Sequence, residues 1–137
     1  MPCNLLIRGE NFDVDLFVEQ TGIPPYEITR KGEQTGASRL QKKTMHLSTL
    51  HYIVSEANFD DHKTQIANAL TFFRTHGEQL AKYATSANID YTYLDFGMDD
   101  HIGYNIICKT FEFPAELLQY LAAIKCDLLV GIYRSNE

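Results

Sequence analysis

Two Asp-Asp-His tripeptides are the residues best suited to metal chemistry in this chain. They are Asp60-Asp61-His62 and Asp99-Asp100-His101, and Asp95 lies close to the second one. Carboxylate and imidazole groups together can hold a divalent metal ion. Aspartates at helix starts and in turns, however, commonly accept hydrogen bonds from backbone N–H groups, and exposed histidines are frequent there. Because nothing in the sequence brings the two tripeptides together, we predict capping roles and no metal site.

The chain carries no recognisable catalytic or nucleotide-binding motif. It lacks a Gly-x-Ser-x-Gly elbow, and the spacing of Gly32 and Gly36 does not fit a phosphate-binding loop. Cys108 falls in an expected strand, where a small core residue is normal. We therefore expect no catalytic residue and no cofactor. An enzyme is the third hypothesis, and it requires a pocket in which titratable groups converge, namely His51, His101 and Asp95.

Basic residues gather in one stretch of an otherwise acidic chain. The net charge is −6 and the pI is about 5.3, so the phosphate backbone of nucleic acid is repelled and no nucleic-acid partner is expected. Five basic residues and one acid lie between positions 30 and 43. A flexible, solvated loop is the ordinary interpretation. The alternative is contact with an acidic partner or an anionic ligand through Arg30, Lys31, Arg39, Lys42 and Lys43.

Two tyrosines are placed to share one face of a strand. Tyr91 and Tyr93 are two residues apart, and exposed aromatic residues on a sheet can stack on RNA bases. The basic, glycine-aromatic motif that accompanies such stacking is missing. We therefore expect these side chains to pack on the sheet.

The composition is that of one folded domain. The 137 residues, with 45% hydrophobic and 22% charged residues, suit a single domain over 1–137. Three cysteines without a short pair spacing do not indicate a disulfide framework or a zinc site, and reduced thiols favour a cytoplasmic protein. The apolar run Leu5-Leu6-Ile7 is too short for a signal peptide or a membrane span, so no membrane contact is expected.

Hydrophobic spacing and helix signals predict strands that alternate with helices. Asp13 starts a helix that ends at Gly22, with Phe12 packed onto Phe17. Asp60-Asp61 starts the longest helix, which Gly77 is expected to break or kink. Another helix follows Pro114. Residues 31–43 are expected to form a long loop, and strands are expected at 4–8, 26–29, 45–55, 89–96, 104–113 and 128–133.

This order predicts an α+β fold. The expected arrangement is ferredoxin-like, βαβ–βαβ–βαβ, with a mixed or antiparallel sheet and helices mainly on one face. A second hypothesis is an internal βα repeat, which would favour the same arrangement: an offset of 101 residues, from Asn4 to Asn105, also places Phe12 on Phe113 and Ile23 on Ile124. Chance matches between apolar positions are the alternative.

The last strand is expected to have two different faces. One set of residues is predicted to lie in the core: Leu128, Val130 and Ile132. The alternate set is neither polar nor fully apolar, which is typical of a partly covered face or a contact surface: Leu129, Gly131 and Tyr133.

Several short motifs resemble those of the bacterial domain of unknown function family 4279. They are Thr21-Gly22-Ile23-Pro24-Pro25, then Arg30-Lys31-Gly32-Glu33, a two-part middle helix with Leu80 and Ala84, and the stretch from Phe113-Pro114 to Ile132-Tyr133. The resemblance covers nearly the whole chain and implies a fold and a bacterial origin, but no activity. The family is associated with a tryptophan at the start of the strand after the loop, where this chain has Met45-His46, so any ligand contact made by that tryptophan is in doubt here.

These observations favour a non-enzymatic protein–protein interaction module. An acidic domain with a semi-apolar sheet face suits a basic protein partner, and an immunity protein that neutralises a toxin is the most specific version. The second hypothesis is a small-ligand sensor that uses the sheet face or the loop at 31–43. The sequence also permits a homo-oligomer.

Overall fold

The computed structural model describes residues 2–35, 43–85, 88–101 and 107–134. None of the helices in these stretches has both the length and the apolarity that are needed to cross a membrane. The elements are, in chain order, β1 (Cys3–Gly9), α1 (Val14–Thr21), β2 (Glu27–Thr29), β3 (Gln34–Thr35), β4 (Lys43–Thr44), β5 (Ser48–Ser55), α2 (His62–Ala84), β6 (Tyr91–Asp99), α3 (Ala115–Ala123) and β7 (Asp127–Tyr133).

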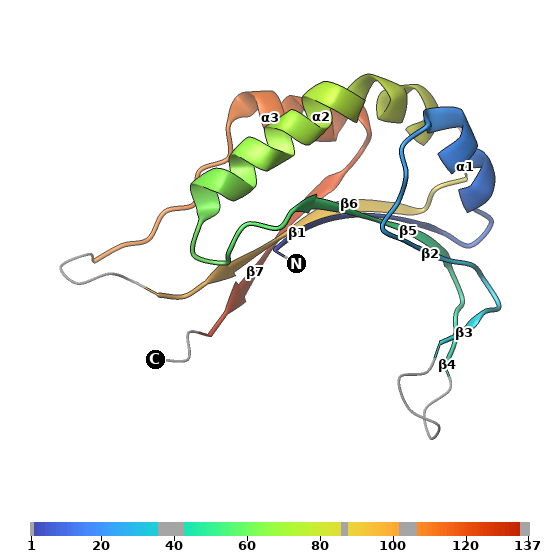
Figure 1. Ribbon diagram of the computed structural model, residues 1–137, viewed down its shortest axis with the longest axis horizontal. Coiled ribbons are helices and arrows are strands. Elements are labelled where there is room, and N and C mark those ends of the chain that lie inside the picture. Colours follow the sequence, from blue (N-terminus) through green and yellow to red (C-terminus); the bar gives the residue numbers. More distant parts are fainter. Residues whose placement is uncertain (1, 36–42, 86–87, 102–106, 135–137) are drawn as a thin grey trace.

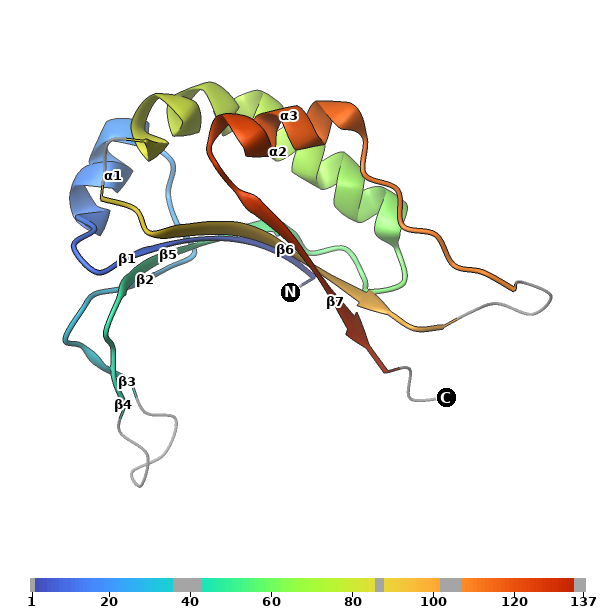
Figure 2. The same cartoon turned by 180° about the vertical axis from the view of Figure 1, so that it is seen from behind.

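The fold is α+β with one mixed sheet. Its strand order is β2-β5-β1-β6-β7, and neighbours are antiparallel except for the parallel pair β6 and β7. All three helices lie on the same side of this sheet (Figures 1 and 2). The mixed sheet and the one-sided helices agree with the expected class, but the strand order differs from that of a simple ferredoxin-like sheet.

The difference has a local cause. A strand was expected at 104–113, but residues 107–113 form no regular element and lead directly into α3; residues 102–106 lie outside the described part. Helix α3 then connects β6 to β7, which is why these two strands are parallel. The proposed βα repeat loses its second strand over 107–109, so the structure does not support it.

Helix α1 begins and ends as its local sequence indicates. The Oδ1 atom of Asp13 accepts a hydrogen bond of 3.1 Å from the backbone N–H of Leu16. The rings of Phe12 and Phe17 are 5.4 Å apart at their centroids. Gly22 follows the last turn with a φ of 69°, the left-handed conformation in which glycine is favoured. All three predictions are confirmed.

Helix α2 is continuous through Gly77, so the expected division into two pieces is wrong, although the second half of the helix bends away from the direction of the first (Figures 1 and 2). The glycine is buried because Tyr120 of α3 packs against it, and a Cβ added at position 77 would lie 3.0 Å from Cδ1 of Tyr120. The same tyrosine stacks on Phe73, with ring centroids 6.0 Å apart. Gly77 therefore lets two helices approach closely, and packing against α3 offsets its low helix propensity.

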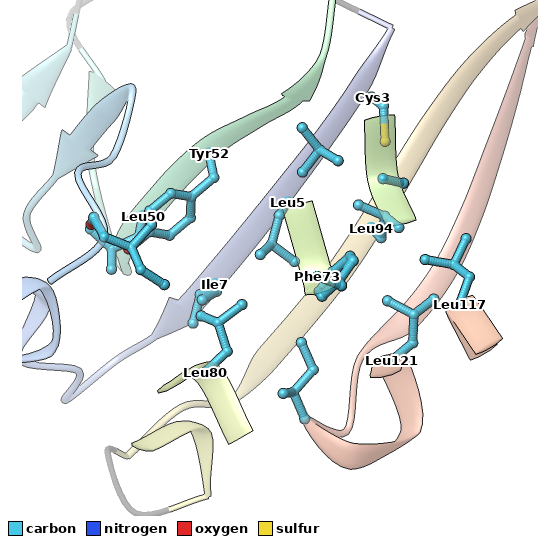
Figure 3. Packing of buried hydrophobic residues seen from close by; sticks show 14 of the residues in the cluster. Cys3, Leu5, Ile7, Leu50, Tyr52, Phe73, Leu80, Leu94, Leu117 and Leu121 are labelled. Carbon is cyan, nitrogen blue, oxygen red and sulfur yellow. The ribbon is translucent and has the colours of Figure 1, made fainter. Parts of the chain in front are cut away.

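The core lies between the helices and the sheet. In β1, the side chains of Leu5 and Ile7 are buried and alternate with those of Leu6 and Arg8 on the opposite face. Figure 3 shows that Phe73 and Leu80 of α2 lie over these strands, next to residues from β5, β6 and α3. The main buried contributors from those elements are Leu50, Tyr52, Leu94, Leu117 and Leu121.

Two further predictions are corrected at the edges of the sheet. The expected loop at 31–43 contains β3 and reaches β4, which pair as a small antiparallel hairpin. In β7, Val130 and Ile132 were predicted to lie in the core, but their exposed fractions are 39% and 54%. The reason is that β7 is the outer strand, and its second half extends beyond α3 (Figure 2).

Gly9 offers a direct test of the packing at the end of β1. A Cβ at this position would collide with the backbone oxygen of Asn88 and lie 2.8 Å from Cβ of Phe12. Because a backbone atom cannot rotate away, we expect Gly9→Ala to lower the free energy of unfolding by about 2 kcal/mol, as overpacking does. Urea denaturation measures the change. Gly131→Ala is the matched control, since its nearest neighbour would be Cε2 of Tyr133 at 3.4 Å; an equal loss in both variants would contradict this account.

Candidate functional site

The first Asp-Asp-His tripeptide has a structural role. The Oδ1 atom of Asp61 accepts a hydrogen bond of 3.1 Å from the backbone N–H of Thr64, which confirms the predicted helix cap. The Nε2 atom of His62 lies 3.0 Å from the carbonyl oxygen of Glu112 and 3.1 Å from its backbone nitrogen. The His62 ring also contacts the rings of Phe111 and Phe113. His62 therefore holds the segment before α3 against α2, a role that sequence reasoning missed.

The second tripeptide lies at the end of β6. The Nζ atom of Lys109 is 2.6 Å from Oδ1 of Asp99, and the backbone N–H of His101 donates to the same oxygen at 3.3 Å. The hydrogen bond from Lys109 is the main reason that the pKa of Asp99 lies below its usual value. Across the described stretches, no group of three or more His, Cys, Asp or Glu side chains is arranged to hold a metal ion.

The enzyme hypothesis requires His51, His101 and Asp95 to converge, but only His51 and Asp95 lie on the same face of the sheet. His51 on β5 is opposite Leu6 of β1, and Asp95 on β6 is opposite Asn4 of β1, so both side chains lie on the side of the sheet away from the helices. Asn4 lies beside both of them: it is opposite Asp95 in the sheet, and its Oδ1 atom is 2.8 Å from Nε2 of His51. His101 follows the end of β6, six residues beyond Asp95. At about 3.3 Å per residue along a strand, this places it well away from the pair.

We call the side of the sheet opposite the helices the helix-free face. One row of it crosses four strands, because His51 is opposite Leu6, Leu6 is opposite Tyr93, and Tyr93 is level with Asp127. In both views of the fold the sheet bends away from the helices (Figures 1 and 2). The other members of the face that carry side chains, set by the same register, are Asn4, Arg8, Glu27, Thr29, Thr49, Ile53, Tyr91, Asp95, Asp99, Leu129 and Tyr133.

Large apolar and aromatic side chains are exposed on this face. Tyr91 is 60% exposed and Leu129 is 46% exposed, while Tyr93 is half-buried. Tyr91 and Tyr93 share this face, as predicted, but the expected packing is wrong for Tyr91, whose side chain at the outer end of β6 is mostly exposed. The guanidinium carbon of Arg8 lies 5.4 Å from the centroid of the Tyr93 ring, a cation–π distance. The face therefore combines aromatic contact area with polar groups, the composition of many protein interfaces.

Acidic groups outnumber basic ones on the face. Among the described strand residues of the face, four carry carboxylates, namely Glu27, Asp95, Asp99 and Asp127, and Arg8 carries a guanidinium. Asp99 is paired with Lys109. Burial raises the pKa of Asp95 and lowers that of His51. Both shifts arise because partial removal from water disfavours the charged form. The face is therefore negative near neutral pH, with a half-buried carboxylate at its centre.

One end of the helix-free face is covered by the chain itself. The rings of Phe59 and Tyr133 are in contact, with centroids 5.1 Å apart. They lie over Gly97, where an added Cβ would be 2.6 Å from Cε1 of Phe59. The accessible part of the face is therefore the region around Tyr91, Tyr93 and Leu129.

The basic residues predicted at 30–43 are partly neutralised by the protein. Arg30 bonds to Asp15 through Nη2 at 2.7 Å and through Nε at 3.1 Å, and Lys31 is 3.3 Å from Glu10. The hydrogen bonds from Arg30 lower the pKa of Asp15. Arg39 and Lys42 lie outside the described residues, and of Lys43 only the backbone, in β4, is described. Contact of this stretch with an acidic partner stays a prediction.

Two of the three thiols, those of Cys3 and Cys126, are poorly suited to nucleophilic catalysis. Burial raises the pKa of Cys3 far above its usual value and that of Cys126 to about 12, so both stay protonated at neutral pH. Cys108 was expected inside a strand, but it is exposed in a segment without regular structure.

A groove runs along the outer side of β5. Its volume is about 860 Å³, and it lies between that strand, one side of α2 and the segment that follows α1. The lining residues are Ile23, Pro24, Pro25, Tyr26, Tyr52, Ile53, Val54, Ser55, Glu56, Ala57, Thr64, Asn68, Phe72 and His76. No motif indicated this groove, because its residues come from three separate parts of the chain.

Residues 1–135 match the family described as Domain of unknown function (DUF4279). The chain belongs to this family. The match spans both the helix-free face and the groove, so both surfaces are built from DUF4279 residues, and the resemblance drawn from the short motifs is confirmed. No curated protein and no solved structure matched the chain.

Two half-buried histidines predict how the stability of this DUF4279 protein depends on pH. Burial lowers the pKa of His51 and of His76 below 6.5 in the folded chain. Between pH 7.5 and 5.5 these two imidazoles therefore take up more protons in the unfolded chain than in the folded chain. The free energy of unfolding should consequently fall as the pH falls. Urea denaturation at both pH values should show a smaller fall for His51→Gln and for His76→Gln than for the wild type. The exposed His46 supplies a control, and a His46→Gln effect of the same size would contradict the assignment.

Proposed function

We propose that this DUF4279 protein is a non-enzymatic protein-interaction module that binds a basic partner through its helix-free face. The observation that carries the proposal is the exposure of Tyr91 and Leu129 beside the half-buried Tyr93, on a sheet face that no described helix covers. Aromatic side chains at the centre of an interface contribute much of its affinity.

Charge supports a basic partner. The chain has a net charge of −6, and Glu27, Asp95 and Asp127 accompany the aromatic side chains on the face. Burial alone raises the pKa of Asp95, so a cation brought by a partner would stabilise its charged form. Complementary charge of this kind speeds association and makes it sensitive to salt.

The finer version of the proposal is an immunity-type protein of the cytoplasm that neutralises a basic toxin. A small acidic inhibitor gains a fast association rate from its charge and a slow dissociation rate from its aromatic contacts. The described cysteines, which form no disulfide, suit a reducing compartment.

A small-ligand function is the second candidate, and the groove beside β5 is the observation that favours it. A volume of about 860 Å³ falls within the usual range for ligand sites, roughly 300–1,000 Å³. Selective binding to the folded state would raise the melting temperature. A reproducible rise with one metabolite, together with no protein partner, would favour this function over the first.

The leading proposal is tested by capture of a partner from a lysate of the source cells with tagged variants. We expect one stoichiometric protein that the wild type retains, and whose retention weakens at high salt. Tyr91→Ala and Leu129→Ala should each weaken binding of the purified partner about tenfold or more, the loss of one hot-spot contact. Mass spectrometry and titration calorimetry supply the measurements.

Leu118→Ala is the matched control for Leu129→Ala. Leu118 is 44% exposed, close to the value for Leu129, but it lies on α3, on the opposite side of the sheet. This variant should bind the partner as the wild type does. A partner whose binding responds equally to both leucine substitutions, or to neither, would show that the helix-free face is not the interface.

A further inference from the structure

Half of β5 has an unpaired edge. On one side β5 pairs with β1 from Ser48 to Ser55, with a register shift between Ile53 and Ser55 that leaves Val54 without a partner in β1. On the other side β2 pairs only with Thr49–His51, so within the described residues Tyr52–Ser55 has no strand partner there. An unpaired edge presents backbone N–H and C=O groups that another extended chain can bond. This short stretch contains none of the lysines or prolines with which proteins usually protect such an edge.

The groove lies directly along this edge. One wall is a single stripe of α2, formed by residues spaced four apart: Thr64, Asn68, Phe72 and His76. Asn68 ties the wall to the strand, because its Nδ2 atom donates to Oγ of Ser55 at 2.8 Å. The far end of the groove is bounded by the segment between α1 and β2, including Pro25 and Tyr26.

The helix wall is longer than the open strand edge. The stripe from Thr64 to His76 covers twelve residue steps, or about 18 Å at 1.5 Å per residue of a helix. The open edge from Tyr52 to Ser55 covers three steps, or about 10 Å at roughly 3.4 Å per residue, and Glu56 and Ala57 continue the wall beyond the strand. An extended segment of about four residues would therefore lie against the strand edge, and the helix stripe would contact it along that length.

The residues that line the groove indicate which side chains such a segment should carry. Phe72 and Ile53, both half-buried, supply apolar contact area, and the buried ring of Tyr52 supports Phe72 from the core, with centroids 6.3 Å apart. Glu56 is the single carboxylate, and no lysine or arginine lines the groove. A segment that carries apolar side chains and at least one lysine or arginine complements this surface.

We propose that the groove binds an extended, basic segment of a partner protein, which adds to β5 along Tyr52–Ser55 as a further strand. Backbone hydrogen bonds to the strand edge supply affinity, and the α2 stripe supplies selectivity. A small molecule would fill the groove without using the strand edge. This inference goes beyond the helix-free face, because it assigns a second surface and a conformation to the bound segment.

The probe is a library of random linear seven-residue peptides displayed on phage and selected against the wild-type protein. The selected peptides are expected to contain lysine or arginine among apolar residues. The best peptide is then synthesised with a fluorophore, and its dissociation constant is measured by anisotropy. Hydrogen exchange should show new protection in β5 between Tyr52 and Ser55 when the peptide is bound.

Two pairs of variants locate the binding site. Thr64→Trp fills the groove, and Thr71→Trp places the same side chain on an exposed position of α2 outside it. We expect at least tenfold weaker peptide binding for the first and less than a twofold change for the second. Thr64→Lys and Thr71→Lys repeat the comparison with a repelling charge in place of bulk, should the tryptophan at position 64 disturb folding. Circular dichroism checks that each variant is folded.

A backbone control separates strand addition from other modes of binding. Two versions of the peptide, N-methylated at the odd or at the even residues, keep all side chains but each lose one alternate set of N–H donors. The version that loses the donors facing β5 should bind at least tenfold more weakly than the other. Equal binding of the two methylated peptides, or the absence of any selected peptide that Thr64→Trp weakens, would overturn the proposal. So would a dimer of the protein that Thr64→Trp dissociates, since a second copy would then occupy the edge. Tyr91→Ala and Leu129→Ala should leave peptide binding unchanged, which keeps this outcome separate from that of the helix-free face.

Discussion

The packing of α2 against the sheet is the interaction on which the rest of the structure depends. Phe73 and Leu80, both fully buried, fix the helix over the central strands. Because Gly77 lacks a side chain, Tyr120 can bring α3 close to α2. At the other end of the helix, His62 holds the segment that leads into α3. The position of α2 thus sets the position of α3 and, through it, the parallel placement of β7.

Covering only one face of a sheet has a consequence for the other face. The residues that alternate with the core positions of β1, β5 and β6 must tolerate partial contact with water, and they form a mixture of polar, aromatic and aliphatic groups. Partial burial lowers the pKa of His51 and raises that of Asp95, so the neutral form of each side chain is favoured. A surface that carries such half-buried groups gains more from a partner than a fully solvated surface does, because the partner can supply the missing charge or hydrogen bond.

Strand β5 connects the two proposed surfaces. His51 and Ile53 belong to the helix-free face, and the edge of the same strand from Tyr52 to Ser55 borders the groove. β2 is only three residues long, which leaves that edge open. A protein partner with a basic, extended segment could engage the edge, while its folded part lies against the sheet. The two surfaces share this strand, but the substitutions that test one surface change no side chain of the other.

Local chemistry could be predicted from the sequence. Asp13 and Gly22 bound α1 through groups that are near neighbours in the chain, and Asp61 starts α2 in the same way. The α+β class, the family and the shared face of Tyr91 and Tyr93 were likewise accessible, because strand and helix periods are local properties. Of the candidate site, sequence reasoning placed Tyr91 and Tyr93 on one face and Leu129 on a possible contact surface, but it identified neither the carboxylates of Glu27 and Asp127 nor the groove.

The sequence by itself determined where α1 and α2 start, how β1 and β6 alternate, and the excess of negative charge. Only the tertiary structure decided that Gly77 continues a helix, that residues 107–113 form no strand, and that the half of β5 after His51 has an open edge. Each of these depends on contacts between residues distant in the chain, such as Tyr120 with Gly77 and His62 with Glu112. Local propensities are worth about 1 kcal/mol or less per residue, so tertiary contacts of similar or larger size can override them.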